Sequence, residues 1–153
     1  MLAEKIMITQ VVTAVTHERV GEVHDKMNTH KLRMIPVVDQ SNCVLGVLST
    51  FSIMQSIIPE YLNSGDLQQI SYAPDLDIVQ RNYISIMQRS VQEFMDTSPL
   101  FVHKNDSLLS VAAAISAHGK HEYALVVDHE KRLLGIISSG DILNRLKLKA
   151  NEV

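Results

Sequence analysis

The sequence predicts a mixed α/β (α+β) fold built from two copies of one βαββα unit. The first observation behind this prediction is a pair of short apolar runs, residues 124–127 and 133–137, joined by a polar turn. Such a pair is typical of a β-hairpin, and apolar residues at helical spacing follow it from Ile142. The second observation is that the same pattern occurs earlier in the chain.

The earlier copy has the same spacing without a gap. Each residue of the later copy lies 89 positions after its counterpart, as Asp128 does after Asp39. Further upstream, with one residue inserted in the second copy, matching apolar residues again recur at helical spacing. Such self-similarity indicates an internal duplication. The identical positions are Val37, Val38, Asp39, Leu45, Gly46, Ser49 and Ile53, which match Val126, Val127, Asp128, Leu134, Gly135, Ser138 and Ile142.

The first copy spans residues 1–58. A β-branched segment at residues 8–15 leads into an amphipathic helix whose inward residues are Val20, Val23 and Met27. The next strand, residues 34–38, carries Pro36 at its start or on an edge, because proline cannot donate to a β-ladder. Residues 44–48 form the returning strand. A closing helix then follows, with Ser49 or Thr50 as its N-cap.

Residues 59–90 form an insertion between the copies. Two turn signatures occur in it, yet its apolar content is too high for a flexible linker, so we expect it to pack on the rest of the chain. Helical spacing then joins Leu76, Val79, Tyr83 and Ile86. Two interpretations remain open: a packed spacer helix, or a surface for a partner or a second subunit. The early apolar residues are Tyr61, Leu62, Leu67, Ile70 and Tyr72.

The second copy spans residues 91–153. Its first long helix carries Leu108, Val111 and Ile115 inward, and Gly119 suits the left-handed position at the helix end. Its last strand ends in small polar residues at the start of the closing helix, residues 141–149. Free N–H groups and the positive end of the helix dipole make such a place suitable for an anion. Asp141 beside it can accept hydrogen bonds from a diol such as ribose.

The hairpin with its Val-Val-Asp run, followed by Gly135-x-x-Ser138-x-x-Asp141, resembles the cystathionine-beta-synthase (CBS) domain. Two copies in tandem resemble a Bateman module, and the resemblance covers about residues 5–58 and 91–148. It implies two repeats related by a pseudo-two-fold axis, with two clefts. Each cleft takes the Gly-x-x-Ser-x-x-Asp ending of one repeat and the lead strand of the other.

Carried over to this chain, the resemblance implies one ligand cleft in which Ile136 lies against a base, Ser138 at a phosphate and Asp141 on the ribose hydroxyls. Alternatives remain for several residues. Ser138 and Asp141 could simply cap a helix, Arg33 could be a solvated surface charge rather than a phosphate contact, and Tyr123 could pack in the core rather than stack on a base. The residues expected to line this cleft are Val11, Val12, Leu32, Arg33, Tyr123, Ile136, Ser138 and Asp141.

The second cleft is expected to be weaker. Phe51-Ser52 stands where Gly140-Asp141 stands in the other repeat, so the ribose-binding carboxylate is missing. The residues assigned to the weaker cleft are Pro99, Leu100, Val47, Ser49 and Ser52.

A second departure from the family concerns the preferred ligand. Glu122 precedes the second hairpin where phosphate-binding members of the family often have Arg or His. An acid at this position favours AMP, adenosine or an S-adenosyl compound over ATP.

The function implied is that of a non-enzymatic sensor, which binds an adenosine-type nucleotide and transmits occupancy by a change of shape. No cofactor is required. A homodimer that pairs through helices is expected, and the alanine run at residues 112–114 would allow close approach. The alternative is a structural protein–protein interaction module with degenerate clefts, which docks a regulated partner.

Composition also bears on the partners, the location and the activity to be expected of the protein. A net charge of −3 gives no reason to expect nucleic acid or an anionic membrane as partner, and no apolar stretch approaches a membrane span. The N-terminus is a poor secretory signal, so a cytoplasmic protein is expected. Cys43 is the only cysteine and is expected to be a bystander. The seven histidines form no compact ligand pair, and no catalytic constellation is found, so neither a metal site nor an enzyme is expected.

Overall fold

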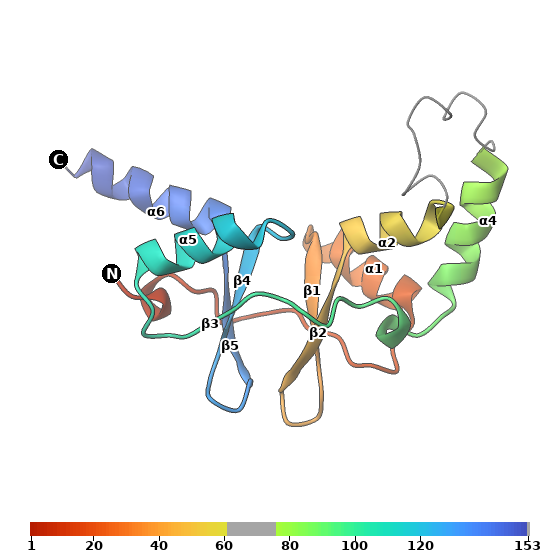
Figure 1. The fold of residues 1–153 in the computed structure, drawn as a ribbon, viewed down its shortest axis with the longest axis horizontal. Helices are drawn as coiled ribbons and strands as arrows, with labels where there is room; N and C mark the ends of the chain where they lie inside the picture. The colour runs from red at the N-terminus through yellow and green to blue at the C-terminus, as the bar shows by residue number, and fades with distance from the viewer. Residues whose placement is uncertain (61–75, 153) are drawn as a thin grey trace. The chain divides into compact units, whose positions relative to one another are not determined.

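The computed structural model describes residues 1–60 and 76–152 and confirms the predicted mixed α/β fold (Figure 1). Both predicted hairpins and both closing helices are present. The elements in chain order are η1 (Ala3–Lys5), α1 (Val20–His30), β1 (Met34–Val38), β2 (Val44–Ser49), α2 (Thr50–Ile57), α4 (Leu76–Met87), η3 (Val91–Glu93), β3 (Phe101–Val102), α5 (Leu108–His118), β4 (Tyr123–Val127), β5 (Leu133–Ser138) and α6 (Ser139–Asn151).

The chain divides into two compact units that exchange their leading segments. Unit 1 contains Met1–Val11, Val38–Val44 and Ser98–Val153, and unit 2 contains Val12–Val37 and Leu45–Thr97. The first residues of the chain therefore pack with the second repeat. Likewise, η3 and the residues after it pack with the first repeat.

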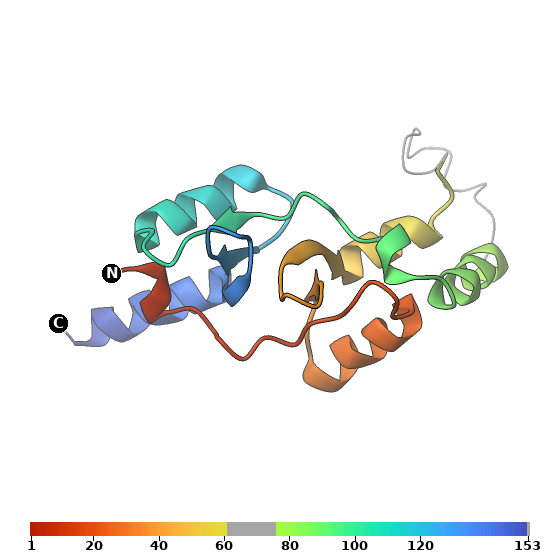
Figure 2. The same ribbon diagram turned by 90° about the horizontal axis from the view of Figure 1, so that it is seen from below.

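Unit 1 is built on a three-stranded sheet in the order β3-β4-β5. β3 runs parallel to β4, and β4 pairs antiparallel with β5. Ile8 extends this pairing, because its N–H and carbonyl both bond to Ile136 at 2.9 Å. Figure 2 shows η1 between α5 and α6. The buried core consists of Ala3, Val102, Val111, Ala124, Val126, Ile137 and Ile142.

Unit 2 is built on the β1–β2 hairpin. Ala14 forms a parallel bridge to Val37, at the position that Val102 and Val126 occupy in the other repeat. The predicted inward residues of α1 are all buried, because a single apolar stripe leaves a helix only one face to bury. The core consists of Ala14, Val20, Val23, Met27, Ile35, Val37, Leu48, Ile53, Ile86 and Val91.

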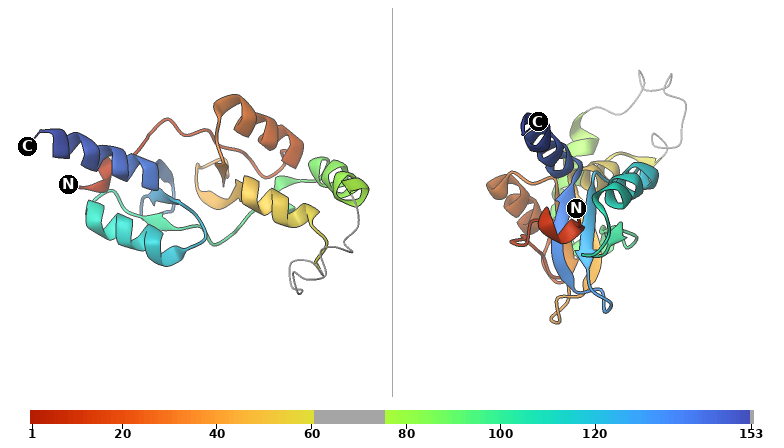
Figure 3. Two further views of the ribbon diagram at one scale, coloured as in Figure 1. Left: turned by 90° about the horizontal axis from the view of Figure 1, so that it is seen from above. Right: turned by 90° about the vertical axis from the view of Figure 1, so that its left-hand side faces the viewer.

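Helix α4 lies in the predicted insertion and packs against both α1 and α2 (Figure 3). Ile86 is buried in the core of unit 2, and a Cβ added at Gly21 would stand 3.0 Å from the Met87 carbonyl oxygen. The helical spacing predicted from residue 76 is thus confirmed. The turn signatures and apolar residues predicted at 61–75 lie outside the described residues.

Arg89, just after α4, pairs with Glu93 through two hydrogen bonds of 3.0 and 3.1 Å. These hydrogen bonds, and then the charge of Glu93, raise the pKa of the Arg89 guanidinium above its ordinary value. The Arg89 guanidinium also lies 5.0 Å from the centre of the Phe94 ring.

The duplication extends to the turns of the two hairpins. The Asp39 carboxylate accepts hydrogen bonds from the N–H groups of Ser41 and Cys43, and Asp128 does the same for Glu130 and Arg132. A short side chain that bonds to backbone two residues ahead stabilises a tight turn. Left-handed residues stand at matching places, Asn42 with φ 64° and Lys131 with φ 62°.

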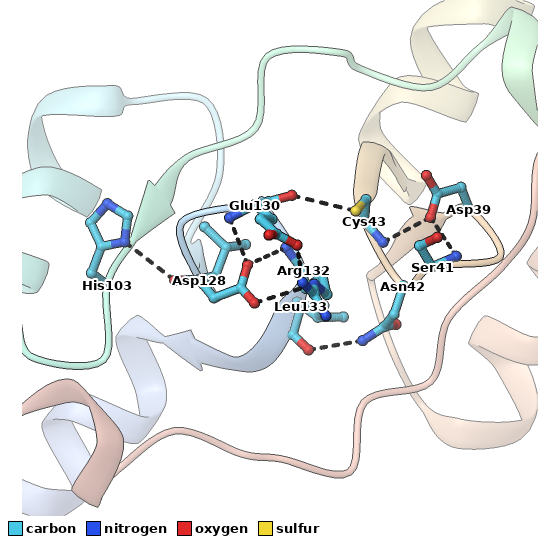
Figure 4. A network of polar contacts seen from close by, with 10 residues as sticks. Asp39, Ser41, Asn42, Cys43, His103, Asp128, Glu130, Arg132 and Leu133 are labelled. Atoms are coloured by element: carbon cyan, nitrogen blue, oxygen red, sulfur yellow. Dashed lines mark hydrogen bonds and ion pairs between the residues drawn. The ribbon is translucent and has the colours of Figure 1, made fainter.

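The two turns also bond to each other within unit 1 (Figure 4). Asn42 exchanges two hydrogen bonds of 3.0 Å with the backbone of Leu133, and the Val44 N–H donates to the Lys131 carbonyl at 2.9 Å. The Cys43 thiol is half-buried and lies 3.4 Å from the Glu130 carbonyl oxygen. Cys43 therefore contributes to this network of polar contacts.

Candidate functional site

Ser138 and Asp141 form a reciprocal cap at the start of α6. The Ser138 Oγ accepts from the Asp141 N–H at 3.0 Å, and Asp141 Oδ2 accepts from the N–H and the hydroxyl of Ser138 at 2.8 and 2.7 Å. The capping interpretation of these two residues is therefore realised. It engages one carboxylate oxygen. Within the described part of the chain, the other oxygen, Oδ1, has no hydrogen bond.

The N–H groups at the start of α6 are mostly occupied. Ser138 and Asp141 use theirs in the cap, and the Ser139 N–H donates to the Glu122 carbonyl at 2.9 Å. Only the Gly140 N–H among these four lacks a partner within the described residues. Asp141 also places a negative charge at the positive end of the helix dipole. Among the described residues, this helix start therefore keeps one backbone N–H and one carboxylate oxygen without a partner.

Three other residues lie around this cap in unit 1. Tyr123 is directly opposite Ser138 in the β4–β5 pair, and Ile136 is half-buried two residues before Ser138 on the same face of β5. Ile8, which bonds to Ile136 through its backbone, keeps 47% of its side chain exposed. Sequence reasoning assigned no role to Ile8. A large apolar residue so exposed is a candidate base contact, and its position in the leading segment of the first repeat is the signal that could have identified it.

The remaining residues of the predicted main cleft are divided between the units. Val11 is half-buried and belongs to unit 1, whereas Val12, Leu32 and Arg33 belong to unit 2. Val12 and Leu32 pack against the core of unit 2, and the Arg33 side chain is exposed. The Arg33 carbonyl accepts from the Thr50 N–H at 2.9 Å, so its backbone lies at the start of α2. Its counterpart in unit 1 is Glu122, which bonds to Ser139 in the same way.

The residues of the predicted weaker cleft are also divided. Pro99 and Leu100 lie in unit 1, where the Leu100 carbonyl accepts from Leu125. In unit 2, Val47 is buried and bonds to Asp96, as Ile136 bonds to Ile8.

Ser49 and Ser52 repeat the reciprocal cap of α6 at the start of α2, with a hydroxyl in place of the Asp141 carboxylate. Ser52 donates its hydroxyl to the Ser49 carbonyl at 2.8 Å and Ser49 is buried, so this cap has no charged acceptor to offer a ribose.

Metal-binding residues do not gather in the described ranges 1–60 and 76–152, where no group of three or more His, Cys, Asp or Glu side chains could hold a metal ion. The His118 and His121 rings stack at 5.9 Å, and His118 Nε2 lies 3.4 Å from the Ser98 carbonyl oxygen. Among the same residues, every helix is too short or too polar to span a bilayer.

A comparison with known protein families identifies the family of the duplicated unit. The model of the CBS domain matches residues 3–58 and 91–148, which is well over half of the chain. The chain belongs to the CBS domain family. Its two matched segments coincide with the two copies identified by the 89-residue offset, so the duplication is a pair of CBS domains on one chain.

Several proteins resemble this CBS-domain chain. The protein MJ1426 of Methanocaldococcus jannaschii is 24% identical over 160 residues, which cover 95% of this chain and 91% of the relative. The CBS-pair protein CBSX2 from Arabidopsis thaliana has a TM-score of 0.77 at 19% identity, over 99% of this chain and 97% of that one. MJ1225 of M. jannaschii has a TM-score of 0.75 at 19% identity; the match covers 95% of this chain but 47% of that longer one.

Two neighbours were solved with ligands. CBSX2 in complex with AMP has a TM-score of 0.71 at 20% identity, over 97% of this chain and 98% of that one. The CBS domain pair of MJ0100, in complex with 5′-methylthioadenosine and S-adenosyl-L-methionine, has a TM-score of 0.70 at 17% identity, with coverage of 97% and 98%. At these identities the likeness shows a shared CBS-pair fold.

Proposed function

We propose that the chain is a non-enzymatic regulatory module that binds an adenosine-type nucleotide at the start of α6, with AMP favoured over ATP. The observation that carries this proposal is the Gly135-x-x-Ser138-x-x-Asp141 ending, in which Asp141 keeps one oxygen without a partner among the described residues. A carboxylate oxygen held rigidly by a cap is a suitable acceptor for a ribose hydroxyl. The adenosine ligands of CBSX2 and MJ0100 support this ligand class.

The preference for AMP follows from the charges and donors at the cap. Three of its four N–H groups are occupied, and both Asp141 and Glu122 are acidic. Each further phosphate would add negative charge beside these carboxylates, which costs electrostatic free energy. Ile136 and Ile8 supply the apolar contacts for a base. The ligand roles of Val11, Val12, Leu32, Arg33 and Tyr123 stay predictions, as do those of the weaker cleft. Occupancy would act by favouring the conformation that binds the ligand better.

Calorimetric titration with AMP, ADP, ATP, NADH and S-adenosylmethionine tests the site. We expect heat with AMP and weaker binding of ATP. Thermal unfolding gives a second readout, because a ligand at a hundredfold excess over Kd stabilises the folded state by about 2.7 kcal/mol. Absence of both heat and a thermal shift with all five compounds would refute the proposal and favour a module whose clefts bind no nucleotide.

We further propose that the module is a homodimer paired through its closing helices. Large apolar side chains on these helices are strongly exposed: Phe51, Met54, Leu143, Leu146 and Leu148. Exposed apolar residues that gather on helices often mark an interface. Light scattering should then give twice the chain mass of 17.1 kDa. Met54→Glu should lower the mass toward that of one chain, whereas Gln55→Glu on the same helix should not. A wild-type chain that is monomeric at its highest soluble concentration contradicts this.

A further inference from the structure

A pocket with a volume of about 440 Å³ lies between α2 and α4 in unit 2, next to Phe94. The duplicated elements alone do not form it, because α4 belongs to the insertion between the two CBS domains. Its volume is in the range of small-molecule sites in proteins. The lining residues on which its chemistry depends are Glu60, Asn82, Ser85, Ile86, Arg89 and Phe94.

Helix α4 and the residues that follow it supply three polar side chains to this pocket. Asn82, Ser85 and Arg89 recur at intervals of three and four residues, and therefore lie on one face. The Arg89 backbone is held in place, since its carbonyl accepts from the Val20 N–H at 2.9 Å. Asn82 Nδ2 donates to the Ile57 carbonyl at 3.0 Å, which leaves Oδ1 as an acceptor. Within residues 1–60 and 76–152, neither this oxygen nor the Ser85 hydroxyl has a hydrogen-bond partner.

The Arg89 guanidinium has an unused edge. Of its five N–H donors, one on Nε and one on Nη2 are bonded to the Glu93 carboxylate. In the part of the chain that the structure describes, Nη1 has no hydrogen bond. The edge formed by the two Nη atoms can therefore bind a second carboxylate through two parallel hydrogen bonds.

The charges around the pocket favour a ligand that carries both signs over an anion. Glu93 neutralises Arg89, and Glu60 adds a further carboxylate to the lining. A phosphate or dicarboxylate would therefore meet one cation and two acids, which is electrostatically unfavourable. An ammonium group on the ligand would instead be attracted by Glu60. Ile86 and Phe94, which pack in the core of unit 2, form an apolar wall beside these polar groups.

We infer that this pocket binds a free α-amino acid with an apolar side chain. Its carboxylate takes the Nη edge of Arg89 and the Ser85 hydroxyl, and its ammonium group takes the Glu60 carboxylate and Asn82 Oδ1. Its side chain lies on the apolar wall. Such a ligand bridges the closing helix of the first repeat and the insertion helix α4. The inference goes beyond nucleotide binding and does not depend on it, because all these residues belong to unit 2 and the start of α6 belongs to unit 1.

Calorimetric titration of the full chain with L-leucine and two matched analogues tests the inference. Isopentylamine is leucine without its carboxylate, and isocaproate is leucine without its ammonium group. We expect leucine to bind at least about tenfold more tightly than either analogue, because each analogue lacks one set of charge-assisted hydrogen bonds. L-methionine and L-phenylalanine extend the titration to other apolar side chains. Inorganic phosphate should give no heat.

Four variants assign the two ends of the ligand. Arg89→Gln should abolish the preference for leucine over isopentylamine. Arg81→Gln, the same change on α4 outside the pocket, should leave it in place. Glu93→Gln breaks the ion pair of Arg89 but keeps the guanidinium, so leucine should still bind. Glu60→Gln should abolish the preference for leucine over isocaproate.

Three outcomes would overturn the inference. The first is the absence of heat with all three amino acids. The second is a phosphate that binds more tightly than leucine, which would make the pocket an anion site. The third is a loss of leucine binding in Glu93→Gln as large as in Arg89→Gln, because the ion pair would then only support the fold. Asp141→Asn, which tests the nucleotide site, should leave the affinity for leucine unchanged, so the failure of one site is distinguishable from that of the other.

Discussion

Replacement of Gly46 by alanine is expected to destabilise the fold by about 3 kcal/mol, which lowers the melting temperature by roughly 10 °C. A Cβ at this position would stand 2.6 Å from the Asp96 carbonyl oxygen and 3.0 Å from the Met95 sulfur. The obstructing oxygen belongs to the backbone, and Asp96 is held to Val47 by two hydrogen bonds of 2.8 and 2.9 Å. The added methyl group must therefore displace the segment and weaken both bonds.

Gly140→Ala is the matched control. Its new Cβ would meet only the Ser138 Oγ, at 3.5 Å, and alanine is favoured over glycine in a helix by about 1 kcal/mol. Thermal and urea unfolding of the two variants measure the difference. Equal melting temperatures for Gly46→Ala and the wild type would contradict the close approach of residues 95–96 to β2.

Replacement of Asp141 by asparagine is expected to weaken AMP binding by about 10- to 100-fold, since a hydrogen bond to a charged group contributes about 1.5–3 kcal/mol. Asparagine has the same shape and keeps one oxygen acceptor for the cap, but it lacks the charge. The helix start should survive, so a loss of affinity reports on ribose binding. Calorimetric titration with AMP measures it.

Ser52→Ala in the other repeat separates capping from binding. Ser52 occupies the position equivalent to Asp141 and makes the same reciprocal cap with Ser49. Its removal should cost about 1 kcal/mol of stability and leave the affinity of the main cleft at the start of α6 for AMP unchanged. If Asp141→Asn binds AMP as tightly as the wild type does, Asp141 is a capping residue and the proposed site is wrong.

Much of the fold could be predicted from the sequence because its signals are local. Apolar residues at helical spacing marked the buried face of α1, and Ser49 and Gly119 marked helix ends through chemistry that acts within one turn. The constant offset between Asp39 and Asp128 aligned the two repeats. Pairings between distant segments carry no such local signal. The bonds of Ile8 to Ile136 could not be located from either residue alone.

The sequence allowed the residues of the candidate site to be predicted, but not the hydrogen bonds between them. Ser138 and Asp141 were identified from their motif, but their mutual hydrogen bonds, which leave a single carboxylate oxygen, depend on the backbone geometry of the α6 start. The position of α4 over Gly21 could not be predicted either, because a glycine in a helix permits the close approach of another segment but does not identify that segment.

The exchange of leading segments between the repeats affects the folding of the chain as well as the stability of its two units. Ala3 is completely buried in unit 1, and its N–H donates to the Asp106 carbonyl, so this segment acquires its partners only when the second repeat has been synthesised. Contacts between such distant segments slow folding. For the same reason, we expect that neither repeat can be cut out as an autonomous fragment at the boundary of its own sequence.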